Sequence, residues 1–241
     1  MSSSRGFWRL VGKLGLKNLA NFALSRQRWL GLRELPIETI IDVGANEGQF
    51  CRKARKTFPD AQIHCFEPIP DLCKKIEAWA AGQNGAVHVQ NLALSSRQTT
   101  AEFYVNDRDT IASSLLTPDQ DRADEYHSIQ VAVDTLDNVC DSINWQRDAL
   151  LKIDTEGFDL EVLRGASQSL ARISAVIVES IFFPSAYGED APLFEDISRE
   201  LFEKGFVYRG NLRGHWHDGV CYGVDAVFCS RETAKKIYDS N

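Results

Sequence analysis

Two carboxylates, Asp154 and Glu156, follow a strongly apolar run in the second half of the chain. The run, residues 149–153, has the composition of a buried strand, and Gly157 comes directly after the second carboxylate. Open α/β sheets bind their ligands at the carboxyl ends of such strands. Carboxylates there can accept a proton, bind a hydroxyl or coordinate a divalent cation. We predict that Asp154 faces a reacting group, and that Glu156 anchors a ligand, a substrate hydroxyl or the following helix.

A glycine-containing turn near the start of the chain predicts a cofactor site. The turn spans residues 42–48 and follows the β-branched run 39–41. A strand that turns into a helix in this way presents free backbone N–H groups at the positive helix end. A dinucleotide-binding turn has a glycine where Asn46 stands, and Glu47 would repel a pyrophosphate. The turn therefore favours S-adenosylmethionine, a ligand without phosphates, and we predict contacts from Asp42, Gly44, Asn46 and Gly48.

Polar residues at the ends of the next two predicted strands fit the same ligand. Glu67 follows the strand predicted for residues 61–66, and an acid about 20 residues after the turn binds ribose hydroxyls in related folds. Asn91 follows the third strand, where its amide could bond the adenine amine beside the backbone of Leu92. A simple turn asparagine is an equally good interpretation of that position.

If the acceptor of the methyl group is a hydroxyl, the transfer needs help, because a hydroxyl is a poor nucleophile. A general base or a metal ion can supply that help. In one hypothesis, His215 of the loop 214–217 or a carboxylate such as Glu179 takes the proton. In the other, Asp154, Glu179 and Asp225 bind a divalent cation, as oxygen ligands suit magnesium. We favour the version without a metal, with Asp154, Glu179 and His215 as the catalytic residues.

The remaining pattern predicts one α/β domain that positions these residues. Strands and helices alternate, which is typical of a doubly wound, mostly parallel Rossmann-like sheet. Two alternating pieces, residues 101–105 and 129–133, predict an antiparallel addition or edge. The last two strands, near 206–208 and 224–228, are expected to be antiparallel neighbours. Helices are predicted over residues 47–57, 70–81, 158–170 and 191–204.

Composition sets limits on location and partners. The chain has 241 residues, a net charge of −7 and six scattered cysteines, which predicts a cytoplasmic protein that does not bind nucleic acid. Residues 1–36 form a separate basic, amphipathic helical segment in this interpretation, and residues 37–241 form the catalytic domain. We favour packing of that helix on the domain; the alternative is contact of residues 5–30 with an anionic membrane surface.

Taken together, these motifs resemble the FkbM-type methyltransferases. The resemblance rests on residues 41–48, 66–68, 91–95, 152–157, 161–166 and 225–228, and it covers roughly residues 38–230. It implies a class I S-adenosylmethionine-dependent fold and O-methylation of a hydroxyl on a sugar, a glycan or a natural product. A nucleotide-binding oxidoreductase and a non-catalytic S-adenosylmethionine-binding protein are the alternatives. The sequence leaves the acceptor and the oligomeric state open.

Overall fold

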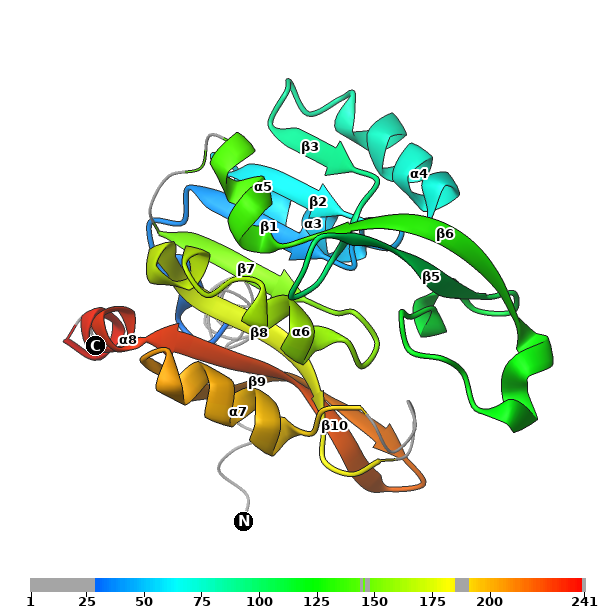
Figure 1. Ribbon diagram of the computed structural model, residues 1–241. Helices are drawn as coiled ribbons and strands as arrows, with labels where there is room; N and C mark the ends of the chain where they lie inside the picture. Colours follow the sequence, from blue (N-terminus) through cyan, green and yellow to red (C-terminus); the bar gives the residue numbers. More distant parts are fainter. Residues whose placement is uncertain (1–28, 144, 146–147, 185–190, 240–241) are drawn as a thin grey trace, which may run out of the picture.

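The computed structural model of the chain describes residues 29–143, 145, 148–184 and 191–239. Its centre is a seven-stranded sheet with the order β3-β2-β1-β7-β8-β10-β9 (Figure 1). The first five strands in this order, β3, β2, β1, β7 and β8, are parallel to one another. Strand β10 runs antiparallel to β8, and β9 runs antiparallel to β10. The α/β prediction with an antiparallel end is confirmed. The strands are β1 Thr39–Val43, β2 Gln62–Phe66, β3 Val87–Gln90, β7 Ala149–Ile153, β8 Ile173–Ile181, β9 Phe206–His217 and β10 Val220–Ser230.

The point where the strand order reverses lies between β1 and β7. From β1 the chain continues outward to β2 and β3, and the later strand β7 returns to the other side of β1. All five residues of β1 and all five of β7 are buried, as expected for strands covered on both faces. Such a reversal opens a crevice at the carboxyl ends of the two strands, where ligands bind in sheets of this kind.

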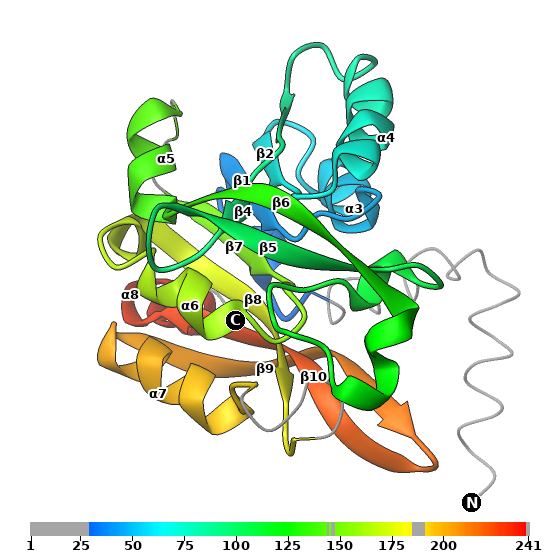
Figure 2. The ribbon, with the colours of Figure 1, turned by 45° about the vertical axis from the view of Figure 1, so that its right-hand side comes forward.

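Helices cover both faces of the sheet and give three layers (Figure 2). One core packs α5 Leu136–Ser142, α6 Asp159–Arg164 and α7 Phe194–Glu203 on the sheet. The other packs α3 Gln49–Thr57 and α8 Arg231–Asp239 on the opposite face, with α4 Pro70–Ala80 at its margin. Within the described ranges, no helix is long and apolar enough to cross a membrane.

The end of the predicted basic segment packs into this second core. Trp29, Leu32 and Leu35 are buried there, and residues Leu32–Glu34 form the 3₁₀ turn η1. Residues 1–28 lie outside the described residues. The amphipathic helix, the domain boundary at residue 36 and the membrane contact of residues 5–30 therefore stay predictions.

The two alternating pieces pair antiparallel with each other, as predicted, and they form a sheet of their own rather than an edge of the main sheet. Strand β6 Tyr126–Asp134 pairs with β5 Thr99–Asn106 and with the short β4 Ala93–Leu94. One face of this sheet is apolar and packs Phe103 and Val131 onto Ile69 and Leu72 at the start of α4. The short 3₁₀ turns η2 Thr110–Ala112 and η3 Gln120–Glu125 lie between β5 and β6.

Two further predictions of secondary structure are wrong in detail. The helix predicted over residues 158–170 stops at Gly165, and a separate 3₁₀ turn, η4, covers Ser169–Arg172. Gly165 lies against the loop before β5: a Cβ there would be 1.9 Å from the carbonyl oxygen of Ser95. The region 214–217, predicted as a loop, belongs to strand β9. Asp218 and Gly219, both with positive φ, close the β9–β10 hairpin in two residues.

Candidate active site

Two cavities open at the ends of β1 and β7 and meet around Gly44, Asn46, Asp154 and Glu156. The smaller encloses about 500 Å³ between β1, the Glu67 loop and the three-stranded sheet. The larger encloses about 1020 Å³, its open mouth included, and extends toward β9 and β10. The crevice expected from the strand order is therefore a continuous site with two ends.

The turn after β1 forms the wall between these cavities. Gly44 has φ +77°, and a Cβ at this position would lie 1.8 Å from the carbonyl oxygen of Asp154. The loops after β1 and β7 thus touch backbone to backbone, and only glycine permits the contact. Gly48, with φ +81°, precedes α3; a Cβ there would meet the Sγ atom of Cys51 at 3.0 Å. Gly44 lines both cavities, whereas Gly48 serves the start of the helix.

Glu67 lines the smaller cavity and is fixed by two backbone N–H groups. Its Oε2 accepts a hydrogen bond from Asn46 N at 2.8 Å, and its Oε1 accepts one from Ile69 N at 2.8 Å. Burial raises the pKa of Glu67 to about 7, although these two bonds act in the opposite direction. Each carboxylate oxygen retains a further lone pair, so the group can still accept hydrogen bonds from a ligand.

After the third strand, Leu92 rather than Asn91 lies at the smaller cavity. Leu92 lines the smaller cavity, and its N–H donates to the carbonyl oxygen of Glu67 at 3.2 Å. The Nδ2 group of Asn91 donates to the carbonyl oxygens of Glu67 and Pro68 at 3.0 and 2.8 Å. Asn91 is not among the residues that line either cavity and holds the Glu67 loop instead; its predicted contact with adenine stays a prediction.

Asp42 lies at the bottom of the larger cavity and is 1% exposed. Its Oδ2 atom has no hydrogen-bond partner among the described residues. Burial raises the pKa of Asp42 to about 7, and the nearby charge of Lys152 partly offsets this increase. A buried acceptor without a partner is costly, and a cationic ligand group in the cavity would remove that cost.

The raised pKa of Asp42 makes stability depend on pH. Between its ordinary pKa of 3.8 and about 7, the native state holds this proton and the unfolded state releases it. The contribution of Asp42 to the free energy of unfolding is therefore fully present below pH 4. It falls by at most about 1.4 kcal/mol per pH unit as the pH rises to 7. We expect Asp42→Asn to gain unfolding free energy relative to the unmodified protein as pH rises from 5 to 8.

Urea unfolding of both proteins at pH 5 and pH 8 measures this difference, because the contributions of other groups cancel. A difference that is the same at both values would contradict the assignment.

Three acids come together at the level where β7 ends, on the neighbouring strands β8 and β10 and in the loop after β7; we call Asp154, Glu179 and Asp225 the strand-end acids. Glu179 and Asp225 are paired across β8 and β10, and Asp154 is the first residue after β7. Carboxylate oxygens of Asp154, Glu156 and Glu179 lie within 4.8 Å of one another. Burial and the charges of Asp154 and Glu156 raise the pKa of Glu179 far above its usual range. Glu179 therefore carries a proton at neutral pH and is unsuited to act as a base.

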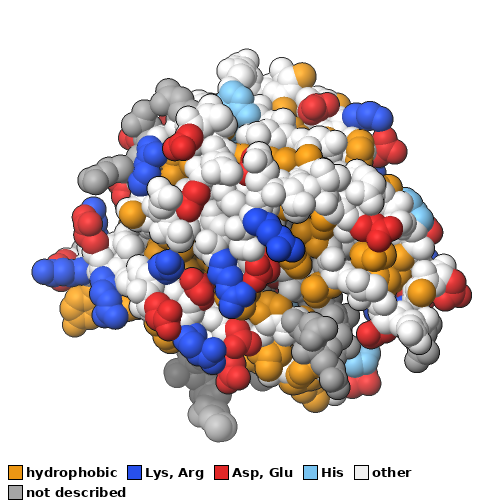
Figure 3. Space-filling view, viewed as in Figure 1, with side chains coloured by type: hydrophobic (Ala, Val, Ile, Leu, Met, Phe, Trp, Pro, Cys, Tyr) orange, Lys and Arg blue, Asp and Glu red, His pale blue; other side chains and the backbone are white. Residues whose placement is uncertain are grey.

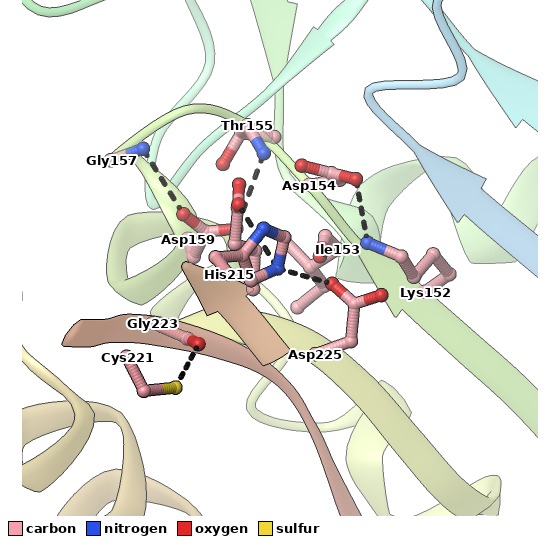
Figure 4. A network of polar contacts seen from close by, with 11 residues as sticks. Lys152, Ile153, Asp154, Thr155, Gly157, Asp159, His215, Cys221, Gly223 and Asp225 are labelled. Atoms are coloured by element: carbon pink, nitrogen blue, oxygen red, sulfur yellow. Dashed lines mark hydrogen bonds and ion pairs between the residues drawn. The ribbon is translucent and has the colours of Figure 1, made fainter. Parts of the chain in front are cut away.

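A histidine–aspartate pair lies beside this cluster (Figure 4). His215 Nε2 is 3.1 Å from Asp225 Oδ1 and 3.5 Å from Glu179 Oε1. Burial alone would raise the pKa of Asp225, but the His215 bond and the Lys152 charge lower it below its usual value. An ionised Asp225 accepts the Nε2 hydrogen and leaves His215 Nδ1 as the basic nitrogen. Glu179 and His215 do not line the two cavities; they reach the larger one through Asp154 and Asp225.

Two buried residues of the site were not predicted from the sequence. Lys152 is 4% exposed, and its Nζ donates to Asp154 Oδ2 at 2.9 Å. Asp159 accepts hydrogen bonds from the backbone N–H groups of Thr155 and Gly157, and so holds the loop that carries Glu156. The sequence does contain a signal for the role of Lys152, which is a cation inside an otherwise apolar strand. A buried charge of this kind needs a nearby partner.

On the outer surface, in contrast, acidic and basic side chains are interspersed over α6 and α7 (Figure 3). Exposed pairs such as Arg164 with Glu161 and Arg199 with Asp196 lie within single helices. Pairs of this kind contribute little to stability. The charges that bear on chemistry are those at the strand ends.

The chain is similar to known methyltransferases over most of its length. The model of the methyltransferase FkbM domain matches residues 42–208, more than half of the chain. The 2-O-methyltransferase NoeI of Sinorhizobium fredii is 24% identical over 162 residues, which cover 62% of this chain and 66% of NoeI, just under two thirds of its length. The methyltransferase sdnD of Sordaria araneosa is 27% identical over 197 residues, 69% of this chain and 73% of sdnD.

A solved structure has the same fold. The methyltransferase FkbM from Methylobacillus flagellatus KT superimposes with a TM-score of 0.52 at 12% sequence identity, over 80% of this chain and 43% of the other. The extent of the family match, together with this fold, decides the assignment. The chain belongs to the methyltransferase FkbM domain family.

Proposed function

We propose that the protein is an S-adenosylmethionine-dependent O-methyltransferase that acts on a hydroxyl of a sugar, a glycan or a natural product. The observation that carries the proposal is the pairing of two features in one crevice. A buried acid suited to ribose, Glu67, lines the smaller cavity, and the His215–Asp225 pair lies beside the larger one. Neither feature alone separates this function from other uses of the fold.

The residues at the crevice fit the methyl donor. Glu67 has acceptor capacity left for ribose hydroxyls, and Leu92 lines the same cavity. The unpartnered Asp42 Oδ2 suits the methionyl ammonium, because a cation there would pair with a buried carboxyl group. Asn46 occupies the position where a dinucleotide site has a glycine, with φ +48° and its N–H committed to Glu67.

Bound S-adenosylmethionine supplies a methyl group that is already activated for displacement. The protein then has to orient the acceptor oxygen, exclude water and remove one proton. We assign proton removal to the His215–Asp225 pair, in which Asp225 holds the imidazole and stabilises the imidazolium that forms. Asp154 faces the transfer centre from the loop after β7, and it lines both cavities.

Two further observations support the proposed chemistry and location. NoeI is described as a 2-O-methyltransferase, and the match spans 66% of it, which supports transfer to oxygen. All six cysteines are free thiols and five of them are buried. Free thiols are typical of a reducing compartment, and we propose the cytoplasm.

Replacement of Glu67 tests the donor site. Glu67→Gln puts an NH₂ group where one acceptor oxygen is needed, and hydrogen bonds to a charged group contribute about 1.5–3 kcal/mol. We expect the affinity for S-adenosylmethionine to fall about 10-fold to 100-fold, as measured by calorimetry. Glu203→Gln, an exposed change on α7, is the matched control and should leave the affinity unchanged.

Ligand tests on the unmodified protein distinguish the proposed function from the alternatives. S-adenosylmethionine should raise the melting temperature, whereas NADH and NADPH should not. Transfer of a labelled methyl group to members of a panel of sugar, glycan and polyketide alcohols would establish catalysis. An unchanged affinity in Glu67→Gln, or stabilisation by a nicotinamide cofactor alone, would overturn the proposal.

A further inference from the structure

A buried ammonium group lies among the strand-end acids. Lys152 is the fourth residue of β7, and its Nζ donates to Asp154 Oδ2 and to the carbonyl oxygen of Ile153, both at 2.9 Å. The side chain is 5% exposed, whereas that of Asp154 is 39% exposed. Lys152 also lines the larger cavity. The ammonium is therefore part of the reaction site rather than of the surface.

The surroundings keep this ammonium charged. Burial alone would lower the pKa of Lys152, but the charges of Asp154 and Asp225 raise it above its usual value. On the other side, Asp42 lies next to Lys152 in the register of β1 and β7. Carboxyl groups on β1, β8 and β10 and in the loop after β7 thus surround the cation. A buried charge that lacked such partners would be strongly destabilising.

Two of these carboxyl groups, those of Asp154 and Glu179, are also donors that a divalent metal could use together with Glu156. Oxygen atoms of Asp154, Glu156 and Glu179 lie within 4.8 Å of one another, and oxygen-rich sets of this kind suit magnesium or manganese. One oxygen of Asp154 is already bonded to the Lys152 ammonium. A metal at Asp154 would therefore face a second positive charge within the same buried space.

We propose that the Lys152 ammonium is the built-in counter-ion of the strand-end acids and takes the place that a divalent cation would have in this site. Lys152 is a positioning residue in this proposal: it fixes Asp154 and keeps Asp225 ionised for its bond with His215. The proposal rests on the proposed function only in taking this crevice as the reaction centre. Ion binding can be measured without turnover, so the counter-ion role of Lys152 and the proposed function can fail separately.

Titration with Mn²⁺, followed by electron paramagnetic resonance, tests this role. We expect the unmodified protein to show no Mn²⁺ binding that depends on Asp154. Lys152→Ala removes the competing charge and opens space, so Mn²⁺ affinity should rise by about 100-fold or more. The increase should disappear in Lys152→Ala/Asp154→Asn. Lys152→Arg keeps the charge and should bind Mn²⁺ as weakly as the unmodified protein.

Lys74→Ala is the matched control, because Lys74 forms an exposed pair with Asp71 at 2.7 Å on α4. It should leave Mn²⁺ binding unchanged. Mn²⁺ binding by the unmodified protein that is lost in Asp154→Asn would overturn the proposal, and this comparison holds even where Lys152→Ala does not fold. A folded Lys152→Ala variant that binds no more Mn²⁺ than the unmodified protein would overturn it as well.

Discussion

Gly44→Ala is expected to destabilise the protein strongly and to abolish binding of S-adenosylmethionine. The new Cβ would lie 1.8 Å from the Asp154 carbonyl oxygen, so the loops after β1 and β7 would have to separate. Left-handed backbone at a residue with a side chain costs about 1–2 kcal/mol, and forced overlap in a packed region costs about 1–3 kcal/mol more. Separation of the loops would also displace the wall that the two cavities share. Urea unfolding and calorimetry measure the two effects.

Gly85→Ala provides a matched control for this experiment. Gly85 has nearly the same φ, +75°, but a Cβ there would have no neighbour within 4 Å. It lies in the turn before β3, away from both cavities. We expect it to show the backbone cost alone, with normal donor binding. Equal losses of stability in the two variants would show that the contact between Gly44 and Asp154 is not the cause.

His215→Ala is expected to lower kcat by about 10²-fold to 10⁴-fold, the usual contribution of a positioned base. The affinity for S-adenosylmethionine should stay the same, because His215 lines neither of the two cavities and its ion pairs are with Glu179 and Asp225. Single-turnover kinetics with the labelled donor measures the first effect, and calorimetry measures the second. A parallel loss of donor affinity would place His215 in the donor site instead.

His217→Ala is the control for the histidine. His217 lies two residues further along β9, and its side chain is 84% exposed, against 12% for His215. We expect normal turnover. Asp225→Asn should reduce kcat as well, and the double variant with His215→Ala should be little worse than the single ones, because residues that act as a unit are not additive. Independent, additive losses would contradict a shared role.

The sequence could predict that most of the residues assigned to the donor lie together, whereas their contacts with a donor stay predictions. Residues 42–48 carry local signals, because the glycines, the β-branched strand and the following helix all lie within one short stretch. Glu67 and Asp154 follow strands whose composition identifies them as buried, and parallel strands end at the same edge of a sheet. The structure brings these residues to one crevice.

The acceptor half was harder to predict, because its geometry depends on long-range pairing. The segment 214–217 is rich in glycine and histidine, and it was interpreted as a loop although it belongs to β9. The pair Asp218-Gly219 was the available signal, since Asp-Gly closes two-residue hairpins. The pKa of Glu179 could not be predicted either, because it is set by neighbours from other strands.

The β9–β10 hairpin and the loops after β1 and β7 join residues at very different separations along the chain. His215 and Asp225 are ten residues apart in the chain and meet across a two-residue turn, so their contact closes a short loop at low entropic cost. By contrast, the loops after β1 and β7 meet only through strand pairing between residues far apart in the chain, such as Thr39 with Ala149. The family match ends at residue 208, within β9 and before His215. The proposed base therefore lies on a hairpin that is largely beyond the matched region and that joins the main sheet through the pairing of β10 with β8.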